Sequence, residues 1–409
     1  MIAAVSTLAA CSGGDDAGEP EAAPTTTVLA DTTTSTSTST TTTVPAPPAL
    51  AWSTEIDGGH DRVVVGPAQV FVLGDQGRVR ALDRDRGGLL WDKPRQRSIA
   101  WSASAVDSDL VLYEVAGATA TVTRLDGATG EARWVAQVGA GGGPELVGDP
   151  GSEELAVLTA PMGASFRTLD LANGALSNAV PGQPRAVGPE RVVSVTDNST
   201  LNFYDLATLA PVAAPIELGS SFGLDALDMS GLDLLMVNGQ ELKLIDAGGT
   251  SLATGRVTRG PGTIVQALGD GRVLVSGFGG SQLFERDGTG FDSLWHSDGI
   301  TLVPRGTDAR YLVVAQGATV DVVDTSVDEP VSIGSIPLGG TPFVEANGRV
   351  VGGRLYLSAG GEHAAYDLAS GVVKVWSVPA AASDVLTPFD DGVLRVTTVG
   401  GKTVVELYR

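Results

Sequence analysis

Few residues of this chain have the types and spacing that catalysis requires. Ser221 lies at the centre of GSSFG, residues 219–223, which matches the G-x-S-x-G pattern of a serine nucleophile. That nucleophile needs a strand before it, a helix after it, and a histidine and an acid converging on it in space. No helical pattern follows residue 223, so we interpret the match as a coincidence in a loop.

The three histidines, His60, His296 and His363, are spread over the chain without the spacing of metal ligands. We interpret each of them as a surface or turn residue. The glycine-rich run VGAGGGP, residues 138–144, lacks the strand, turn and helix that surround a phosphate-binding loop. We interpret it as a flexible connection.

Two pairs of acids, Asp107 with Asp109 and Asp390 with Asp391, are the nearest approach to a calcium site. Both pairs lie where hairpin turns are expected, and no D-x-D-x-D-G loop organises them around a cation. We interpret these carboxylates as solvated turn residues. The sequence therefore predicts neither a metal nor another cofactor.

The one cysteine, Cys11, points to a modification instead. It follows Leu8, Ala9 and Ala10 in TLAACSGG, which resembles the lipobox of bacterial lipoproteins. That resemblance implies lipid on Cys11 and removal of the preceding segment, so that the lipid alone anchors an extracytoplasmic protein to the outer face of the bacterial cell membrane. Residues 1–11 are then the signal peptide with its lipobox. Because residues 1–10 contain no Lys or Arg, we expect this signal peptide to be truncated at its start.

Residues 12–49 are predicted to form a disordered tether. They contain almost no large apolar side chains and include the run TTTSTSTSTTTTVPAPP, residues 32–48. Such a segment cannot bury enough surface to offset the entropy lost on ordering. Fully extended, it would span on the order of 100 Å.

The charge of the chain restricts its partners. A net charge of −22 and a pI near 4.4 repel phosphate backbones and anionic lipids, so nucleic acid is excluded as a partner and a basic or cation-bearing one is favoured. With a single cysteine, no disulfide can form within the chain. No run approaches the roughly 18 apolar residues of a membrane-spanning helix.

A repeated hairpin pattern dominates the rest of the chain, residues 50–409. Each copy is an apolar strand, a Gly, Asn or Asp turn, and a second strand that usually ends in an apolar residue and Asp. Nine copies recur at a spacing of about forty residues. They occupy residues 70–83, 110–126, 155–170, 192–205, 234–246, 273–287, 311–324, 355–367 and 394–408.

A second turn follows the terminal Asp of several copies. In LDGATGEARW, residues 125–134, the carboxylate of Asp126 can accept backbone N–H groups while Gly130 supplies a left-handed conformation. The same pair of turn residues recurs as Asp83 with Gly87, Asp170 with Gly174, and Asp367 with Gly371. The pattern is looser at Asp287 with Gly290, and we expect the turn to degrade at Asp205 and Asp324.

Five of the six tryptophans share one position relative to these turns, eight or nine residues after an Asp or at the equivalent place at the start of the series. A ring in that position can bury some 150–250 Å² against the next repeat. We therefore predict that these residues dock neighbouring repeats onto one another. They are Trp52, Trp91, Trp134, Trp295 and Trp376.

These patterns predict an all-β fold, a single propeller of four-stranded blades over residues 50–409. About four strands fit into each forty-residue unit, and helical periodicity is absent. The chain ends after a hairpin that has no Trp-type strand, whereas LAWSTEI, residues 50–56, is a Trp-type strand without a hairpin. We expect residues 50–56 to pair with residues 403–408 in one shared blade, because closing the ring removes sheet edges.

The Asp, Gly and Trp pattern resembles the tryptophan-docking repeat of the pyrroloquinoline-quinone-like propeller superfamily. That resemblance implies eight blades, although the hairpins number nine, and we expect one weak copy near residues 175–208 to be merged or distorted. The superfamily includes quinone-dependent dehydrogenases and non-enzymatic scaffold lipoproteins, such as the propeller lipoprotein of the machinery that assembles outer-membrane β-barrels.

We expect a function of the second kind: a monomeric, non-enzymatic, lipid-anchored binding or scaffold module for a protein, peptide or envelope polymer. The alternative is a divergent quinone-dependent dehydrogenase or another propeller enzyme. A dehydrogenase would need a central calcium or lanthanide and a catalytic aspartate, and the alcohol dehydrogenases also use a disulfide that this chain cannot form.

Overall fold

A computed structural model of the chain describes residues 48–75, 77–95, 101–116, 119–139, 145–147, 155–159, 165–197, 199–218, 226–258, 264–277, 279–301, 310–339, 347–381, 384–389 and 391–409. These residues lie in one compact unit, residues 44–409. Cys11, the signal peptide (1–11) and residues 12–47 of the tether lie outside the described residues, so their predicted roles remain predictions. Within the described ranges no helix is long and apolar enough to cross a membrane.

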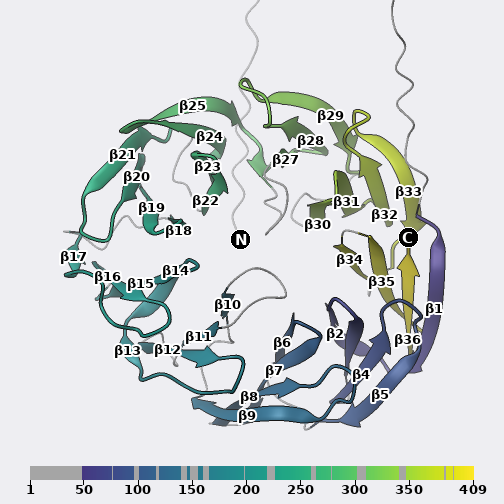
Figure 1. Ribbon diagram of the computed structural model, residues 1–409. Helices are drawn as coiled ribbons and strands as arrows, with labels where there is room; N and C mark the ends of the chain where they lie inside the picture. The colour runs from purple at the N-terminus through teal and green to yellow at the C-terminus, as the bar shows by residue number, and fades with distance from the viewer. Residues whose placement is uncertain are drawn as a thin grey trace, which may run out of the picture. The chain divides into compact units, whose positions relative to one another are not determined.

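The described strands are grouped into four-stranded blades that stand around a ring (Figure 1). Blade A contains β2 (His60–Val65), β3 (Gln69–Gly74), β4 (Arg78–Asp83) and β5 (Leu89–Pro94). Blade B contains β6 (Trp101–Val106), β7 (Asp109–Ala116), β8 (Thr119–Leu125) and β9 (Ala132–Gly139). Blade C contains β10 (Glu145–Val147), β11 (Leu155–Thr159), β12 (Ser165–Asp170) and β13 (Val180–Pro181).

The chain continues around the ring in the same order. Blade D contains β14 (Gln183–Val187), β15 (Arg191–Thr196), β16 (Thr200–Asp205) and β17 (Ile216–Glu217). Blade E contains β18 (Ala226–Ser230), β19 (Asp233–Asn238), β20 (Glu241–Ile245) and β21 (Ser251–Arg256). Blade F contains β22 (Ile264–Gly269), β23 (Arg272–Gly277), β24 (Gly280–Asp287) and β25 (Gly290–Ser297).

Three further blades complete the ring. Blade G contains β26 (Ile300–Thr301), β27 (Tyr311–Gln316), β28 (Thr319–Asp324) and β29 (Val331–Pro337). Blade H contains β30 (Asn347–Val351), β31 (Arg354–Ala359), β32 (Glu362–Asp367) and β33 (Val373–Pro379). Blade I combines β34 (Val385–Phe389), β35 (Gly392–Val399) and β36 (Lys402–Tyr408) with β1 (Leu50–Asp57) from the start of the unit.

The all-β propeller is confirmed, and its blade number follows the hairpin count. Seven separate four-stranded sheets and one eight-stranded sheet, blades E and F joined through β21 and β25, give nine blades in the described residues. The expectation of eight was wrong. Of the two outcomes expected for the weak copy, merged or distorted, the structure shows distortion. The weak repeat near residues 175–208 supplies parts of blades C and D, whose outer strands β13 and β17 have only two residues each.

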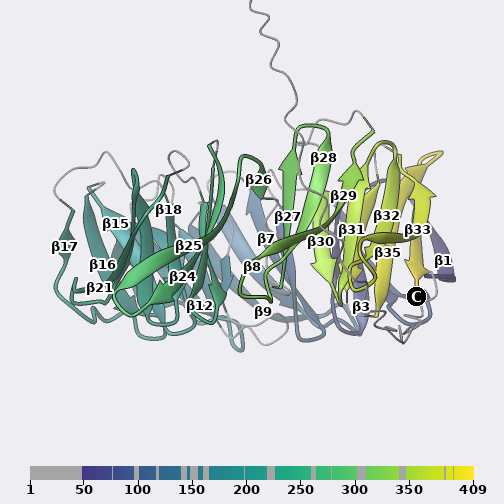
Figure 2. The same ribbon diagram turned by 90° about the horizontal axis from the view of Figure 1, so that it is seen from above.

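Strand chemistry explains the blades. The sheets are antiparallel meanders in which short turns join neighbouring strands, as in β19 and β20, where Asn238 pairs with Glu241 and Gly239 has a φ of 61°. Strands in the middle of each blade are rich in Val and Leu, and their side chains are buried on both faces because another blade covers each face. Outer strands such as β33 (Figures 1 and 2) also carry exposed residues, as at Val373, Lys374 and Ser377.

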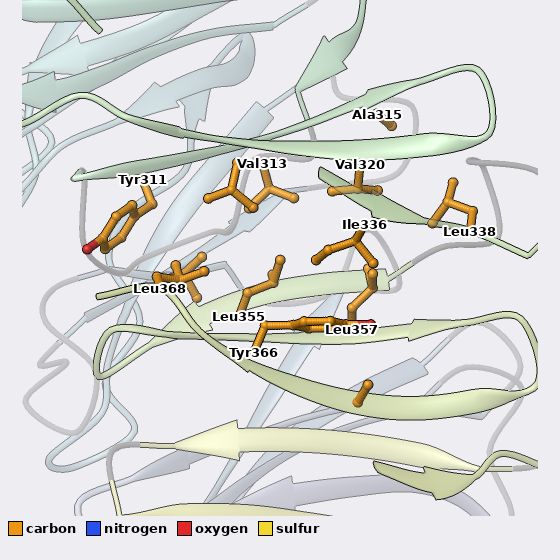
Figure 3. Packing of buried hydrophobic residues seen from close by; sticks show 13 residues of the cluster. Tyr311, Val313, Ala315, Val320, Ile336, Leu338, Leu355, Leu357, Tyr366 and Leu368 are labelled. Atoms are coloured by element: carbon orange, nitrogen blue, oxygen red, sulfur yellow. The ribbon is translucent and has the colours of Figure 1, made fainter. Parts of the chain in front are cut away.

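The core is divided into nine apolar clusters, one at each contact between neighbouring blades, including the contact between blades I and A. Figure 3 shows the cluster between blades G and H, in which Val313 and Val320 face Leu355, Leu357 and other side chains of the next blade. Because each blade is packed on both faces, the apolar packing is continuous around the ring.

The ring is closed by β1, as the sequence predicted. It pairs antiparallel with β36 from Leu50 opposite Tyr408 to Asp57 opposite Lys402. Beyond the strands, the Ala49 and Arg409 backbones exchange two hydrogen bonds, of 2.6 and 2.9 Å. Ile56 of β1 is 7% exposed and packs in the cluster between blades I and A.

Removing residues 50–57 should therefore lower the melting temperature by roughly 10 °C or more, because it leaves the edge of β36 unpaired and exposes the cluster between blades I and A. Differential scanning calorimetry of the full chain and the deletion measures this effect. Deletion of residues 12–43, which lie outside the compact unit, is the matched control and should leave the melting temperature unchanged. Equal melting temperatures for the wild type and the 50–57 deletion would contradict closure by β1.

Candidate functional site

The predicted docking tryptophans lie at contacts between blades. Trp91 of blade A is 8% exposed, and its indole N–H donates a hydrogen bond of 2.8 Å to the Gly127 carbonyl in the turn of blade B. Its ring covers Gly130 so closely that a Cβ there would lie 2.7 Å from a ring carbon. Gly130 also has a φ of 68°, so both the space and the backbone favour glycine.

Two more tryptophans repeat this geometry. The indole of Trp52 donates 2.9 Å to the Arg84 carbonyl and covers Gly87, and that of Trp134 donates 2.9 Å to the Leu171 carbonyl and covers Gly174. Each ring therefore lies on the turn of the next blade. The same arrangement, an indole hydrogen-bonded to the next turn and lying on its glycine, therefore recurs at three consecutive contacts: blade I with A, A with B, and B with C.

The aspartates build these turns from within. Asp126 accepts hydrogen bonds from the amides of Ala128 and Thr129, at 3.0 and 2.9 Å, and from the Thr129 hydroxyl. The bond from the Thr129 amide, helped by the other bonds and by Arg133, lowers the pKa of Asp126. Corresponding amide bonds reach Asp83, Asp170 and Asp367.

The other two tryptophans lie at blade contacts without a hydrogen bond of this kind among the bonds described for them. Trp376 is 8% exposed and meets Tyr408 edge to face, with 5.2 Å between ring centroids, where blade H contacts blade I. Trp295 packs against the cluster between blades F and G. Gly371 has a φ of 85° and open space around its Cα, since β29 of the preceding blade carries no tryptophan.

Where the preceding blade lacks a tryptophan, the turn itself supplies a side chain. Leu209 occupies the position of the turn glycine after Asp205 with a φ of 54°, is 5% exposed and packs between blades C and D. Its amide still donates to the Asp205 carbonyl, and Asp205 accepts from Thr208, so the expected degradation of this turn was wrong. Val372, with a φ of 61°, packs against Gly334 at the contact between blades G and H.

A cluster of polar side chains lies at the contact between blades H and I. His363 of β32 is 3% exposed, so its interpretation as a surface or turn residue was wrong. Its Nδ1 lies 2.7 Å from the Ser358 hydroxyl, and its Nε2 lies 3.2 Å from the carboxylate of Asp384, which precedes β34. Burial lowers the pKa of His363, although Asp384 acts in the opposite direction.

Arg395 of β35 extends this cluster. It donates to Asp384 at 2.9 and 3.0 Å and to Glu406 at 3.3 Å, and Glu406 accepts the Tyr408 hydroxyl at 3.0 Å. Burial raises the pKa of Asp384, but hydrogen bonds from neighbours such as the Ala381 amide and Arg395 outweigh it and lower that pKa below its ordinary value. Asp384 is therefore ionised at neutral pH and compensated by Arg395.

The line Ser358, His363 and Asp384 has the order of a nucleophile, a base and an orienting acid. Its side chains nevertheless serve a contact between blades, because the His363 and Asp384 side chains are 4% and 0% exposed. We therefore interpret the line as a polar joint between blades H and I. Ser221, the serine that the sequence singled out, lies outside the described residues.

Ring closure brings a second histidine to the same blade. His60 of β2 in blade A lies with its Nδ1 3.2 Å from the hydroxyl of Thr398 in β35. Burial lowers its pKa, and Asp61 and Asp384 oppose that effect. Sequence spacing could not show this, since His60 and His363 are far apart in the chain and meet the same blade only because the ring closes. His296 is exposed on β25 of blade F.

The acid pairs also have structural partners. Asp109 is 3% exposed and accepts Arg124 and Arg133, each at 2.6 Å, so its interpretation as a solvated carboxylate was wrong. Asp107 pairs with Arg124 at 3.0 Å, and Asp391 pairs with Arg84 and Arg409. Asp390 and residues 140–144 of the glycine-rich run lie outside the described ranges.

Residues of blades B, C and D line an open cleft of about 870 Å³; they include Asp107, Arg124, Thr168, Asp170, Leu176 and Ala207. Its charged members are already bonded: Arg124 to Asp107, and Asp170 to the turn amide of Ala172. Among the residues that the structure describes, no group of three or more His, Cys, Asp or Glu could hold a metal ion.

Comparisons with known proteins support the fold. A family model described as outer membrane protein assembly factor BamB matches residues 31–207. The dihydro-heme d1 dehydrogenase NirN, solved in complex with DHE, is 15% identical with a TM-score of 0.51, covering 80% of this chain and 78% of its own. The computationally designed Ika8 protein is 17% identical with a TM-score of 0.51, covering 79% of this chain and 98% of its own.

BamB from Moraxella catarrhalis is 16% identical with a TM-score of 0.46, covering 88% of this chain and 98% of its own. No curated protein matches the sequence. At such identities the NirN and Ika8 structures bear on the fold alone. The nine blades of the described residues form a β-propeller, and residues 31–207 are similar to the family of that assembly factor.

We predict that Trp91→Ala destabilises the protein by about 3–5 kcal/mol, because it empties the space over the blade B turn and leaves the Gly127 carbonyl without its indole partner. Urea unfolding measures the change. Gly130→Ala should also destabilise, through a steric clash with the Trp91 ring as well as backbone strain. Gly371→Ala is the matched control, with strain but open space; an equal loss in both glycine variants would contradict docking by Trp91.

We further predict that Arg395→Ala costs about 3–5 kcal/mol, because it leaves the buried Asp384 carboxylate without its cation. Lys374→Ala in blade H removes an ion pair with Glu362 whose side chains are both about two-fifths exposed, and should cost less than about 1 kcal/mol. Comparable losses for the two variants in chemical denaturation would show that the joint around Asp384 contributes no more than a surface pair.

Proposed function

We propose that this protein is a lipid-anchored extracytoplasmic propeller that binds other molecules as a scaffold. The family match supports an envelope role in general terms, because its description is that of an outer membrane protein assembly factor. The resemblance of TLAACSGG to a lipobox supports lipid on Cys11, a tether over residues 12–49 and a propeller over residues 50–409. In this proposal the membrane is reached only through that lipid.

The observation that carries the binding role is a difference between two kinds of side chain: polar clusters make contacts inside the propeller, whereas several large apolar side chains are exposed to solvent. In the described part of the chain, the cluster of His363, Asp384 and Arg395 is committed to the contact between blades H and I, and Asp109 to ion pairs within blade B. Half of the twelve large apolar side chains that are exposed in the described residues lie on the outer strands β1, β5, β9, β29 and β33. They are Leu50, Leu89, Leu90, Val135, Val331 and Val373, each between 38% and 56% exposed.

These outer strands suit a protein or peptide partner. They form edges of their sheets and lie on the outer side of the ring (Figure 1). An extended segment can add to such an edge through main-chain hydrogen bonds, while exposed apolar residues bury part of its surface. The net charge of −22 favours a partner that carries basic residues.

A photo-crosslinking residue in place of Leu90, 43% exposed on β5, should capture a defined envelope protein in intact cells, because the proposal places the partner on the outer strands. Val399 is the matched control: it is also apolar, 62% exposed, and lies at the hairpin end of β35, a strand that is not an edge of its sheet.

The same cells carrying Cys11→Ser should release the protein from the membrane fraction, whereas Ser12→Ala should not.

Three results would count against parts of the proposal. Crosslinking that is equally diffuse at Leu90 and Val399 would argue against a partner on the outer strands. Quinone- and calcium-dependent oxidation of alcohols or sugars, measured by dye reduction together with a thermal shift, would instead support the dehydrogenase alternative. If the Cys11→Ser protein stayed in the membrane fraction, lipid anchoring through Cys11 would be contradicted, but the proposed binding role would not.

A further inference from the structure

Two of the three histidines of the chain flank the blade that closes the ring. His363 joins blade H to blade I through Ser358 and Asp384, and His60 joins blade A to blade I through Thr398. Blade I is also the blade to which β1 is added through β36. Its strands are therefore fixed to both neighbours by contacts that include an imidazole.

The neutral ring of His363 satisfies both of its hydrogen bonds. With its proton on Nε2, the ring donates to Asp384 and accepts from the Ser358 hydroxyl, so both nitrogens are satisfied. A second proton makes Nδ1 a donor, and the Ser358 hydroxyl must reverse to accept it. The added positive charge would lie in a site where the His363 side chain is only 4% exposed. There Asp384 is already paired with the positive charge of Arg395.

The charged groups around each ring are few. His363 faces Asp384 from the segment before β34 and Arg395 from β35, with Glu406 and Tyr408 of β36 behind Arg395. His60 faces Thr398 of β35, with Asp61 beside it in its own strand and Asp384 at longer range. At both rings, burial opposes the charged form more strongly than the acids favour it.

We propose that His60 and His363 make blade I an acid-sensitive joint of the ring, so that mild acidification loosens β1 and β34–β36 before the other blades. Blades A and H keep their apolar clusters with blades B and G, and the effect is local because His296, the remaining histidine, is exposed on blade F. Opening this joint would expose the faces of blades A and H that pack against blade I, and the ring would open where the ends of the chain meet.

The direction follows from linkage. Burial lowers the pKa of both rings in the folded protein, whereas in the unfolded chain it stays near the ordinary value of 6.5. Above pH 6.5 both states are neutral and the contribution to stability is complete. As the pH falls below 6.5 the unfolded or locally opened chain takes up the proton first, so stability is lost until the folded pKa is reached.

Hydrogen exchange measured by mass spectrometry at pH 7.5 and 5.5, corrected for the intrinsic rates, tests the proposal on the full chain. We expect the protection of residues 50–57 and 385–408 to fall by about tenfold relative to residues 109–125 of blade B. The double variant His60→Gln and His363→Gln should lose this regional pH dependence, and His296→Gln should keep it.

A uniform loss of protection around the ring, or an unchanged regional effect in the double variant, would overturn the proposal. If the double variant does not fold, titration of the His60 and His363 ring protons by NMR in the wild type decides: both pKa values should lie below 6.5. Values at or above 6.5 would refute the proposal.

Discussion

Pairing of β1 with β36 is the constraint on which the remaining structure depends. A ring of blades has no separate core, because its apolar side chains lie in nine clusters that each need two neighbouring blades. If the ends of the unit did not pair, blade I would lack its outer strand, and the cluster between blades I and A would lose Ile56 and the contact of Trp52. Closure thus completes the packing of the first and the last blade together.

Packing between blades is solved in two complementary ways. At five contacts a tryptophan of one blade reaches the next, and in three of these its ring lies on a glycine that has no room for a side chain. At the contacts of blade C with D and of G with H, the turn instead carries Leu209 or Val372 in a left-handed conformation. The packing of these side chains, buried at Leu209 and partly buried at Val372, offsets the cost of a backbone conformation that branched residues avoid. At each of these contacts a side chain fills the space between the two blades; it is a tryptophan at five of them and Leu209 or Val372 at the other two.

The sequence predicted those features that depend on local chemistry and regular spacing. The hairpins, the Asp turns and the pairing of residues 50–56 with 403–408 follow from strand and turn residues that recur about every forty positions. The blade number was mistaken where the family resemblance was preferred to the nine hairpins, because β13 and β17 are short and carry no tryptophan. The prediction for the turn at Asp205 was wrong because residue 209 is leucine, whereas the same left-handed position carries glycine in other turns. The contact of His60 with Thr398 depends on ring closure, and that of His363 with Asp384 depends on how two consecutive blades pack; no local pattern encodes either contact.

Closure itself is open to a direct covalent test, since Ser53 lies opposite Glu406 in the pairing of β1 with β36. In a Cys11→Ser background, which removes the only native thiol, Ser53→Cys with Glu406→Cys should form a disulfide that joins the two ends of the propeller and increases electrophoretic mobility under non-reducing conditions. Ser53→Cys with Lys402→Cys is the control, since Lys402 lies opposite Asp57. Two free thiols in the first variant, or equal crosslinking in both, would contradict a ring closed by β1 and β36.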